Sequence, residues 1–200
     1  MKRIPKCSFL LCLIGFFTFF SFNKLAAQGF RFGFGGSLLD VKSSYISIPS
    51  FQKSAYSISF GWQFNDNFSC LLGATIVDRI KTDTTQNIYY PDDTAEFGIV
   101  DVSIRYYFVF ENEQKIMPWL GFGYAIENAN WDTFFYSVTT TGVSISLGFE
   151  YKIGYGFLFD VFYQYQTTDG YDTYDYGPYQ LTTTEIGVQI HYLIELENLR

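Results

Sequence analysis

Apolar and small polar residues alternate along much of the chain, and the alternation is clearest in residues 56–64. Large apolar side chains stand at every even position there, from Tyr56 through Ile58 to Phe64, and every odd position is Ser, Gly or Gln. Because successive side chains of a β-strand point to opposite faces, this period predicts a strand with one apolar and one small polar face. The pattern recurs, with no charge on the apolar face, in residues 100–108, 143–151, 157–165 and 186–194.

Three weaker alternating segments bring the number of predicted strands to eight. One begins with Phe30, Phe32 and Phe34, which alternate with Arg31 and two glycines. No segment after the N-terminal region shows an apolar period of 3.6 residues, so we predict no helix there. The predicted strands span residues 29–41, 55–64, 68–80, 96–110, 118–127, 138–152, 156–166 and 182–195.

The predicted connections alternate between long and short. The long, polar ones span residues 42–54, 81–95, 128–137 and 167–181, and the short ones span 65–67, 111–117 and 153–155. Transmembrane β-barrels have this asymmetry, with short turns on one side of the membrane and long loops on the other. Aromatic residues gather near the short connections, where they would form an interfacial girdle: Trp62, Phe64, Phe68, Phe108, Phe110, Trp119, Tyr151, Tyr155, Phe157 and Tyr192.

Alternation alone does not decide whether the apolar face contacts lipid or a protein core. A soluble β-barrel or sandwich alternates in the same way, with its apolar face inside. Here the more polar face is rich in Ser and Gly, which suit a narrow interior better than a solvated surface. A closed ring also removes every exposed strand edge, as lipid demands. We therefore predict an all-β protein, an eight-stranded antiparallel up-and-down transmembrane β-barrel.

The first 27 residues have the composition of a cleavable signal peptide. A basic start is followed by an apolar run from Cys7 to about Phe22, and then by small residues that favour cleavage after Ala27. An uncleaved anchor is the alternative, but the apolar run is shorter than the ~20 residues of a spanning helix. Residues 28–200 would then form one barrel domain.

The predicted mature chain is acidic. Nine of the 13 Lys and Arg residues remain beside all 20 Asp and Glu residues, a net charge of 9 − 20 = −11. This balance argues against nucleic acid as a partner. Only Cys70 remains of the three cysteines, so no disulfide framework is expected.

Residues 99–108 and 118–123 carry a resemblance to a known family. The Arg105 cation before paired aromatic residues, and the entry to the next strand at Pro118-Trp119, resemble the central hairpin of small eight-stranded outer-membrane β-barrel proteins of Gram-negative bacteria. The resemblance implies an outer-membrane location, contact with outer-membrane lipid and assembly by the insertion machinery, but no single activity. Such barrels often end on an aromatic residue, whereas here eight residues follow Tyr192.

Seven ionisable residues fall on the predicted inner faces, with acids and bases mixed. Because an unpaired buried charge is costly, we expect them to pair across the lumen. Strand direction places five of them, all but Asp101 and Glu185, at one level near the short connections. The interior is then either a filled core or a narrow, porin-like channel, and the filled core is favoured because eight strands leave room only for side chains. The seven residues are Arg31, Asp101, Arg105, Glu150, Asp160, Glu185 and His191.

Candidate catalytic and metal chemistry is sparse. His191 is the single histidine, and a lipid-modifying enzyme with a His base would need it near the long loops, whereas it falls at the opposite end. A polar residue of the interior is therefore the favoured interpretation of His191. No His or Cys cluster has metal-ligand spacing, and no cofactor is predicted.

The long connections carry the strongest candidates for specific contacts. They are dense in Tyr, Trp and Asp, and aromatic residues of this kind give a large contact area at low entropic cost. Aromatic residues that simply meet lipid headgroups are the alternative. The contact candidates, for an extracellular protein or glycan, are Tyr89, Tyr90, Trp131, Tyr171, Asp172, Tyr174, Asp175, Tyr176 and Tyr179.

The sequence favours a non-enzymatic integral outer-membrane protein. Its barrel would anchor surface loops for adhesion, ligand contact or envelope integrity. A narrow ion or solute channel is the main alternative, followed by a lipid-modifying enzyme and a soluble secreted binder.

Overall fold

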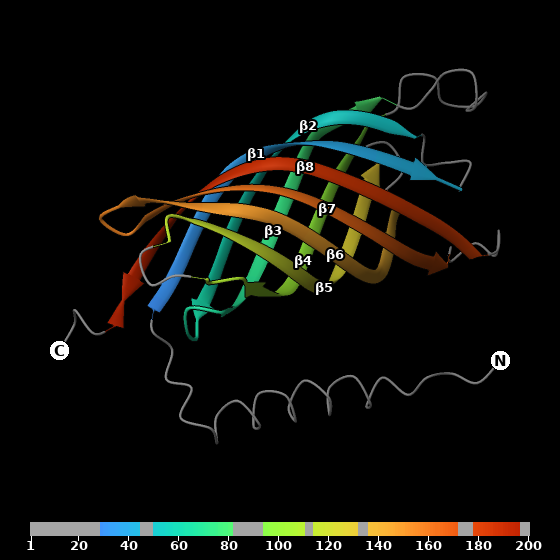
Figure 1. Ribbon diagram of the computed structural model, residues 1–200. Coiled ribbons are helices and arrows are strands. Elements are labelled where there is room, and N and C mark those ends of the chain that lie inside the picture. The colour runs from blue at the N-terminus through green and yellow to red at the C-terminus, as the bar shows by residue number, and fades with distance from the viewer. Residues whose placement is uncertain are drawn as a thin grey trace, which may run out of the picture.

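The computed structural model describes residues 29–44, 50–81, 94–110, 114–131, 136–171 and 178–196. These residues form a closed barrel in which each strand pairs antiparallel with the next and β1 pairs with β8 (Figure 1). The predicted all-β fold is confirmed. The eight strands are β1 (Gly29–Ser43), β2 (Phe51–Gln63), β3 (Phe68–Lys81), β4 (Thr94–Tyr107), β5 (Ile116–Trp131), β6 (Tyr136–Gly154), β7 (Phe157–Tyr171) and β8 (Pro178–Glu195).

The predicted assignment of faces also holds through most of the barrel wall. Tyr56 and Ile58 on β2 point outward and are 76% and 61% exposed to the surroundings. Ser57 between them points inward and is buried. A β-strand places alternate residues on opposite sides, so the apolar set covers the outside and the small polar set lines the lumen.

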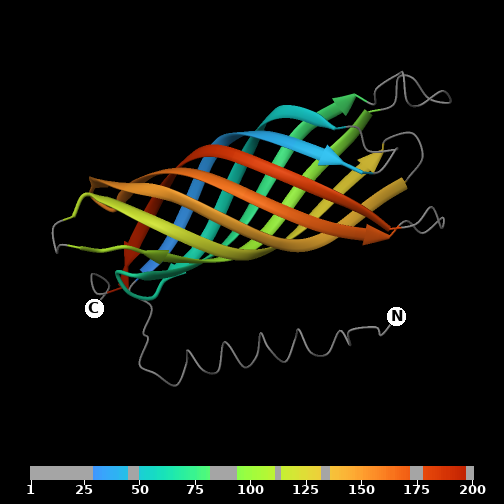
Figure 2. The ribbon, with the colours of Figure 1, turned by 45° about the vertical axis from the view of Figure 1, so that its right-hand side comes forward.

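One end of the barrel, here called the short-turn end, is closed by tight connections (Figure 2). Between β2 and β3, the Asn65 carboxamide oxygen accepts hydrogen bonds from the backbone N–H groups of Asn67 and Phe68, each at 2.8 Å. Between β6 and β7, Gly154, Tyr155 and Gly156 all have positive φ angles, a conformation in which glycine is unstrained. Gly29 and Glu195, paired with each other, also lie at this end.

The strands run farther toward the opposite, long-loop end than the sequence predicted. β2 begins at Phe51 rather than at residue 55, β5 continues to Trp131 rather than 127, and β7 continues to Tyr171 rather than 166. The predicted ends lay where the outward apolar positions stop. Strand pairing continues beyond that point because backbone hydrogen bonds do not depend on which kind of side chain faces outward.

The outer wall therefore has two zones. In the apolar band, the outward residues are apolar or Gly from the short-turn end up to Leu38, Tyr56, Ile76, Val100, Ile126, Val143, Tyr165 and Ile186. Above it, toward the long-loop end, lies a polar collar. Its outward residues are Asp40, Lys42, Gln52, Ser54, Arg79, Glu96, Asn128, Asn130, Thr139, Thr141, Thr167, Asp169, Gln180, Thr182 and Thr184.

At the same level, the inward side chains change from polar to apolar. Behind the collar the inward residues pack into a buried hydrophobic cluster, here called the apolar plug, in which the rings of Phe51 and Phe97 meet edge to face at 5.3 Å. The small polar residues that the sequence places on the inner faces therefore do not continue to this end. The buried members of the plug are Leu39, Val41, Ala55, Val77, Ile80, Phe97, Ile99, Ala125, Ala129, Val138 and Leu181.

Candidate functional site: the barrel interior

Arg31, on β1 near the short-turn end, is the centre of a first group of buried polar contacts. Its guanidinium is ion-paired and hydrogen-bonded with the Glu150 carboxylate. It also donates to the Gln63 side-chain oxygen at 2.9 Å and to the Tyr107 hydroxyl oxygen at 2.5 Å. These partners come from β6, β2 and β4, so one side chain, only 1% exposed, ties together strands on opposite sides of the barrel.

A second group forms around Asp160 on β7, which is fully buried. One carboxylate oxygen accepts a hydrogen bond from Arg105 at 2.6 Å, and the other accepts one from the Trp119 indole N–H at 2.8 Å. The Arg105 guanidinium lies 3.8 Å from the centre of the Trp119 ring, in cation–π geometry. His191 Nε2 is 3.5 Å from the same carboxylate.

Trp119 corrects one prediction. The sequence placed it in the aromatic girdle on the outer surface, but it is buried in the lumen. Its strand shows the reason, because Leu120 and Phe122 occupy the outward positions and Trp119 has the opposite parity. Crowding of aromatic residues at the short-turn end suggested an interfacial position, whereas parity was the more reliable signal.

The seven predicted interior charges separate into two levels. Arg31, Arg105, Glu150, Asp160 and His191 lie in the two groups just described. Asp101 and Glu185 line a separate small cavity of about 20 Å³ farther from the short-turn end, which Arg105 also borders. Glu185 is buried, and Asp101 is partly buried.

Glu127 is an interior carboxylate that the sequence reading missed. It is 1% exposed and accepts hydrogen bonds from Gln166 Nε2 at 2.7 Å, from Thr168 Oγ1 at 2.6 Å and from Thr140 Oγ1 at 3.3 Å. The predicted strand 118–127 includes Glu127 as its last residue, but the predicted set of interior charges does not. The parity of Glu127, opposite to Phe122 and Ile126, was the signal that pointed inward.

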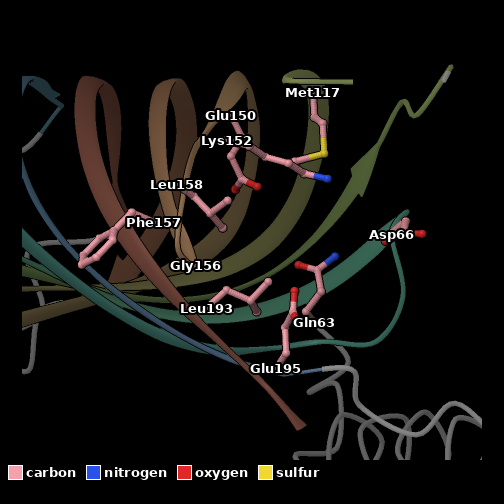
Figure 3. Close-up of a pocket in the computed structure, with 11 residues that line it drawn as sticks. Gln63, Asp66, Met117, Glu150, Lys152, Gly156, Phe157, Leu158, Leu193 and Glu195 are labelled. Atoms are coloured by element: carbon pink, nitrogen blue, oxygen red, sulfur yellow. The ribbon is translucent and has the colours of Figure 1, made fainter. Parts of the chain in front are cut away.

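At the short-turn end the lumen opens into a cavity of about 330 Å³ (Figure 3). Met117, Leu158 and Leu193 give it apolar walls, and Glu150 lies on its lining while bound to Arg31. Asp66, Lys152 and Glu195 add charges to the lining. A cavity of this size is within the range of small-molecule sites. On its inner side, however, the polar lining residues Glu150 and Gln63 are already hydrogen-bonded to Arg31.

The described interior offers little for acid–base catalysis, and its carboxylates do not gather in threes. His191 Nε2 lies 3.5 Å from Asp160, whose two carboxylate oxygens already accept from Arg105 and Trp119. Among the described residues, no serine or threonine hydroxyl is hydrogen-bonded to either ring nitrogen, as a nucleophile would be in a catalytic pair. Across the described ranges, no group of three or more His, Cys, Asp and Glu side chains is arranged to hold a metal ion.

Most of the predicted contact residues lie outside the described residues. Tyr89, Tyr90, Asp172, Tyr174, Asp175 and Tyr176 are in this position. Trp131, Tyr171 and Tyr179, which the sequence placed in loops, belong instead to the ends of β5, β7 and β8 at the long-loop end. The predicted strands 118–127, 156–166 and 182–195 stop short of these positions at the long-loop end, because the outward apolar residues stop there.

A comparison with protein families gives a match over nearly the whole chain. The profile of the outer membrane protein beta-barrel domain matches residues 9–192. The chain belongs to this family. Its place is therefore the outer membrane, and the apolar band of this outer-membrane barrel is its lipid-facing surface.

Solved structures support the same fold at low sequence identity. Neisserial surface protein A is 17% identical, with 84% of this chain and 98% of that chain covered and a TM-score of 0.67. Ail of Yersinia pestis, in complex with the heparin analogue sucrose octasulfate, is 13% identical, with 82% and 99% covered and a TM-score of 0.52. OprG of Pseudomonas aeruginosa is 14% identical, with 83% and 96% covered and a TM-score of 0.50.

No curated protein matches the chain. Within the described residues, no helix is long and apolar enough to cross a membrane.

Proposed function

We propose that this outer-membrane barrel is a non-enzymatic anchor that holds surface loops for contact with an extracellular protein or glycan. The observation that carries the proposal is the apolar plug, which packs eleven buried side chains across the interior at the long-loop end. Below it, the Arg31 and Arg105 ion pairs bridge the lumen. A filled interior leaves the loops as the part of the molecule with free area for a partner.

The long connections have a distinct charge. Residues 45–49, 82–93, 132–135 and 172–177 together contain six Asp residues and no Lys or Arg. Such loops favour cationic protein patches or hydroxyl-rich glycans, and binding that depends on charge weakens as salt rises. A polyanion such as the heparin analogue bound by Ail suits them poorly.

The membrane partners follow from the fold and the family. The apolar band contacts outer-membrane lipid, and we expect the insertion machinery to assemble the barrel with both termini in the periplasm and the long loops outside. The polar collar then lies in water outside the lipid, since its outward residues favour water over hydrocarbon.

The test replaces residues 172–177 by a Gly/Ser segment of equal length and compares it with a variant in which the same six residues are scrambled. Cells displaying each form are assayed for binding to a cationic protein, a neutral glycan and a sulfated glycan, and folding is checked by heat-modifiable gel mobility. We expect both variants to fold, and binding to the first two partners to fall in both.

Planar-bilayer recordings test the main alternative, a narrow channel. A barrel with a filled lumen gives no single-channel steps, whereas steady conductance of the wild type would overturn the anchor. Unchanged binding in both loop variants would place the contact elsewhere on the protein.

A further inference from the structure

A small cavity lies inside the lumen between the ion pairs and the apolar plug. Its volume is about 20 Å³, enough for one water molecule or one small ion. Residues of β2, β3, β4, β7 and β8 border it, among them the carboxylates of Asp101 and Glu185. It is separate from the larger cavity at the short-turn end, with which it shares no lining residue.

The charges around this cavity do not balance. Between the short-turn end and the apolar plug, the lumen holds four carboxylates, Asp101, Glu150, Asp160 and Glu185, against the two guanidinium groups of Arg31 and Arg105. Glu150 and Asp160 are paired directly with these two cations. The excess is 4 − 2 = 2 negative charges, carried by the two acids at the cavity, and even a protonated His191 would leave one of them.

The excess negative charge costs more free energy at Glu185 than at Asp101, because Glu185 is the more buried of the two. The residue is 3% accessible, and its Oε1 atom has no hydrogen-bond partner among the described residues. Asp101 lines the same small cavity, so the two carboxylates repel each other when both are ionised. A buried carboxylate without a counter-charge costs several kcal/mol, so an occupant with positive charge would relieve both groups.

Part of the remaining lining supplies oxygen atoms, beside apolar side chains such as Leu71 and Phe162. Thr75 and Ser103 bring hydroxyl groups to the cavity. Gln164 and Gln189 also line it, and their amide nitrogens donate elsewhere, to Gln166 at 3.2 Å and to Ser57 at 2.9 Å. Their carbonyl oxygens are the acceptor atoms of these amides, and that of Gln189 also accepts a long hydrogen bond from Ser59 Oγ at 3.4 Å. Arg105 borders the cavity too, but its terminal nitrogen is held by Asp160.

We propose that this cavity binds one divalent cation, and that Ca²⁺ fits it better than Mg²⁺. Two carboxylates offset a double positive charge, and Ca²⁺ accepts mixed sets of carboxylate, hydroxyl and carbonyl oxygens in flexible geometry. Mg²⁺ keeps several of its waters, for which a volume of 20 Å³ has no room. The ion enters while the barrel forms, because both ends of this level are filled in the folded state.

The experiment refolds the full chain from urea into detergent in the presence of Ca²⁺, of Mg²⁺ or of a chelator. Bound metal is counted by native mass spectrometry, and the midpoint of thermal unfolding is recorded. The site variant is Asp101→Asn with Glu185→Gln. The matched controls are Glu127→Gln, a buried acid already satisfied by hydrogen bonds, and Asp169→Asn, an exposed acid of the collar.

We expect one Ca²⁺ per chain and a raised unfolding midpoint for the wild type and both controls. The site variant should retain no bound Ca²⁺ and show the same midpoint with Ca²⁺ and with chelator. Should that variant fail to fold, Glu185→Asp keeps the charge but shortens the reach, and we expect at least about tenfold weaker Ca²⁺ binding from it.

Three outcomes would overturn the proposal. The first is a wild type that folds without bound metal and does not respond to Ca²⁺, which would mean that the cavity holds water between neutral acids. The second is full Ca²⁺ binding by the site variant. The third is loss of binding in Asp169→Asn alone, which would move the site to the outer surface.

Discussion

The apolar band and the polar collar are built from the same eight strands with the same alternation, yet their polarity is reversed. In the band, apolar residues such as Ile58 face outward and Ser57 faces inward. In the collar, Thr141 and Lys42 face outward while Val41 and Ile99 are buried inside. The medium outside the wall changes from lipid to water, and the interior takes the complementary composition.

The two zones are therefore stabilised by different forces. Behind the collar, folding removes apolar side chains from water, as in a soluble protein, at roughly 25 cal/mol per Å² buried. In the band, the outward side chains remain in hydrocarbon, so their burial contributes little. There the interior hydrogen bonds and ion pairs hold the strands together across the lumen. Each zone should then respond to a different kind of substitution.

The largest expected effect is on the ion pairs of the band. Replacement Arg105→Ala leaves Asp160 buried without its cation and removes the contact with the Trp119 ring, so we expect a loss of about 3–5 kcal/mol in the free energy of unfolding. Urea unfolding in lipid vesicles measures this. The control is Lys42→Ala in the collar, where we expect a change within about 0.5 kcal/mol. Equal small losses in both variants would contradict the structural role of the pair.

A second substitution tests the boundary between the zones on a single strand. Leu147 and Thr141 both face outward on β6, Leu147 in the band and Thr141 in the collar. Leu147→Arg should destabilise the barrel by about 2–4 kcal/mol, because the charge faces hydrocarbon. Thr141→Arg faces water and should be close to neutral. Unfolding measured in vesicles with each variant checks this, and equal costs would mean that the collar is also embedded.

The smallest expected effect comes from removing one methylene group, either from the apolar plug or from the lipid-facing surface of the band. Ile99 is buried in the apolar plug, and Ile145 faces lipid in the band. Ile99→Val should lose about 0.5–1.5 kcal/mol, since a buried methylene is removed from a packed core. Ile145→Val exchanges lipid contact for lipid contact and should change little. The measurement compares the free energies of unfolding of the two variants. A larger loss for Ile145→Val than for Ile99→Val would contradict the assignment of Ile99 to a packed core.

Strand existence and strand order could be read from the sequence because they depend on local periodicity. The alternation over residues 56–64 or 143–151 can be recognised from neighbouring residues alone. The pairing of β1 with β8 follows from a different argument, because lipid requires that no strand edge is left unpaired. The interior position of Arg31, Arg105, Glu150, Asp160 and His191 followed from parity alone. Their grouping at one level followed from strand direction, since antiparallel neighbours return to the same height.

Other features were decided only when the strands closed into a barrel. The strand ends in the collar and the packing of the apolar plug both depend on where the outer medium changes from lipid to water, and this level is set by the barrel as a whole. Likewise, the partners of Asp160 come from β4, β5 and β8. Which cation, indole and imidazole meet there therefore depends on the register of the four pairings from β4 to β8. The sequence by itself determined which face of each strand is inside, because the period of a strand is local. Which inner side chains meet, and where lipid gives way to water, was decided by the closed barrel, because both are set by long-range register.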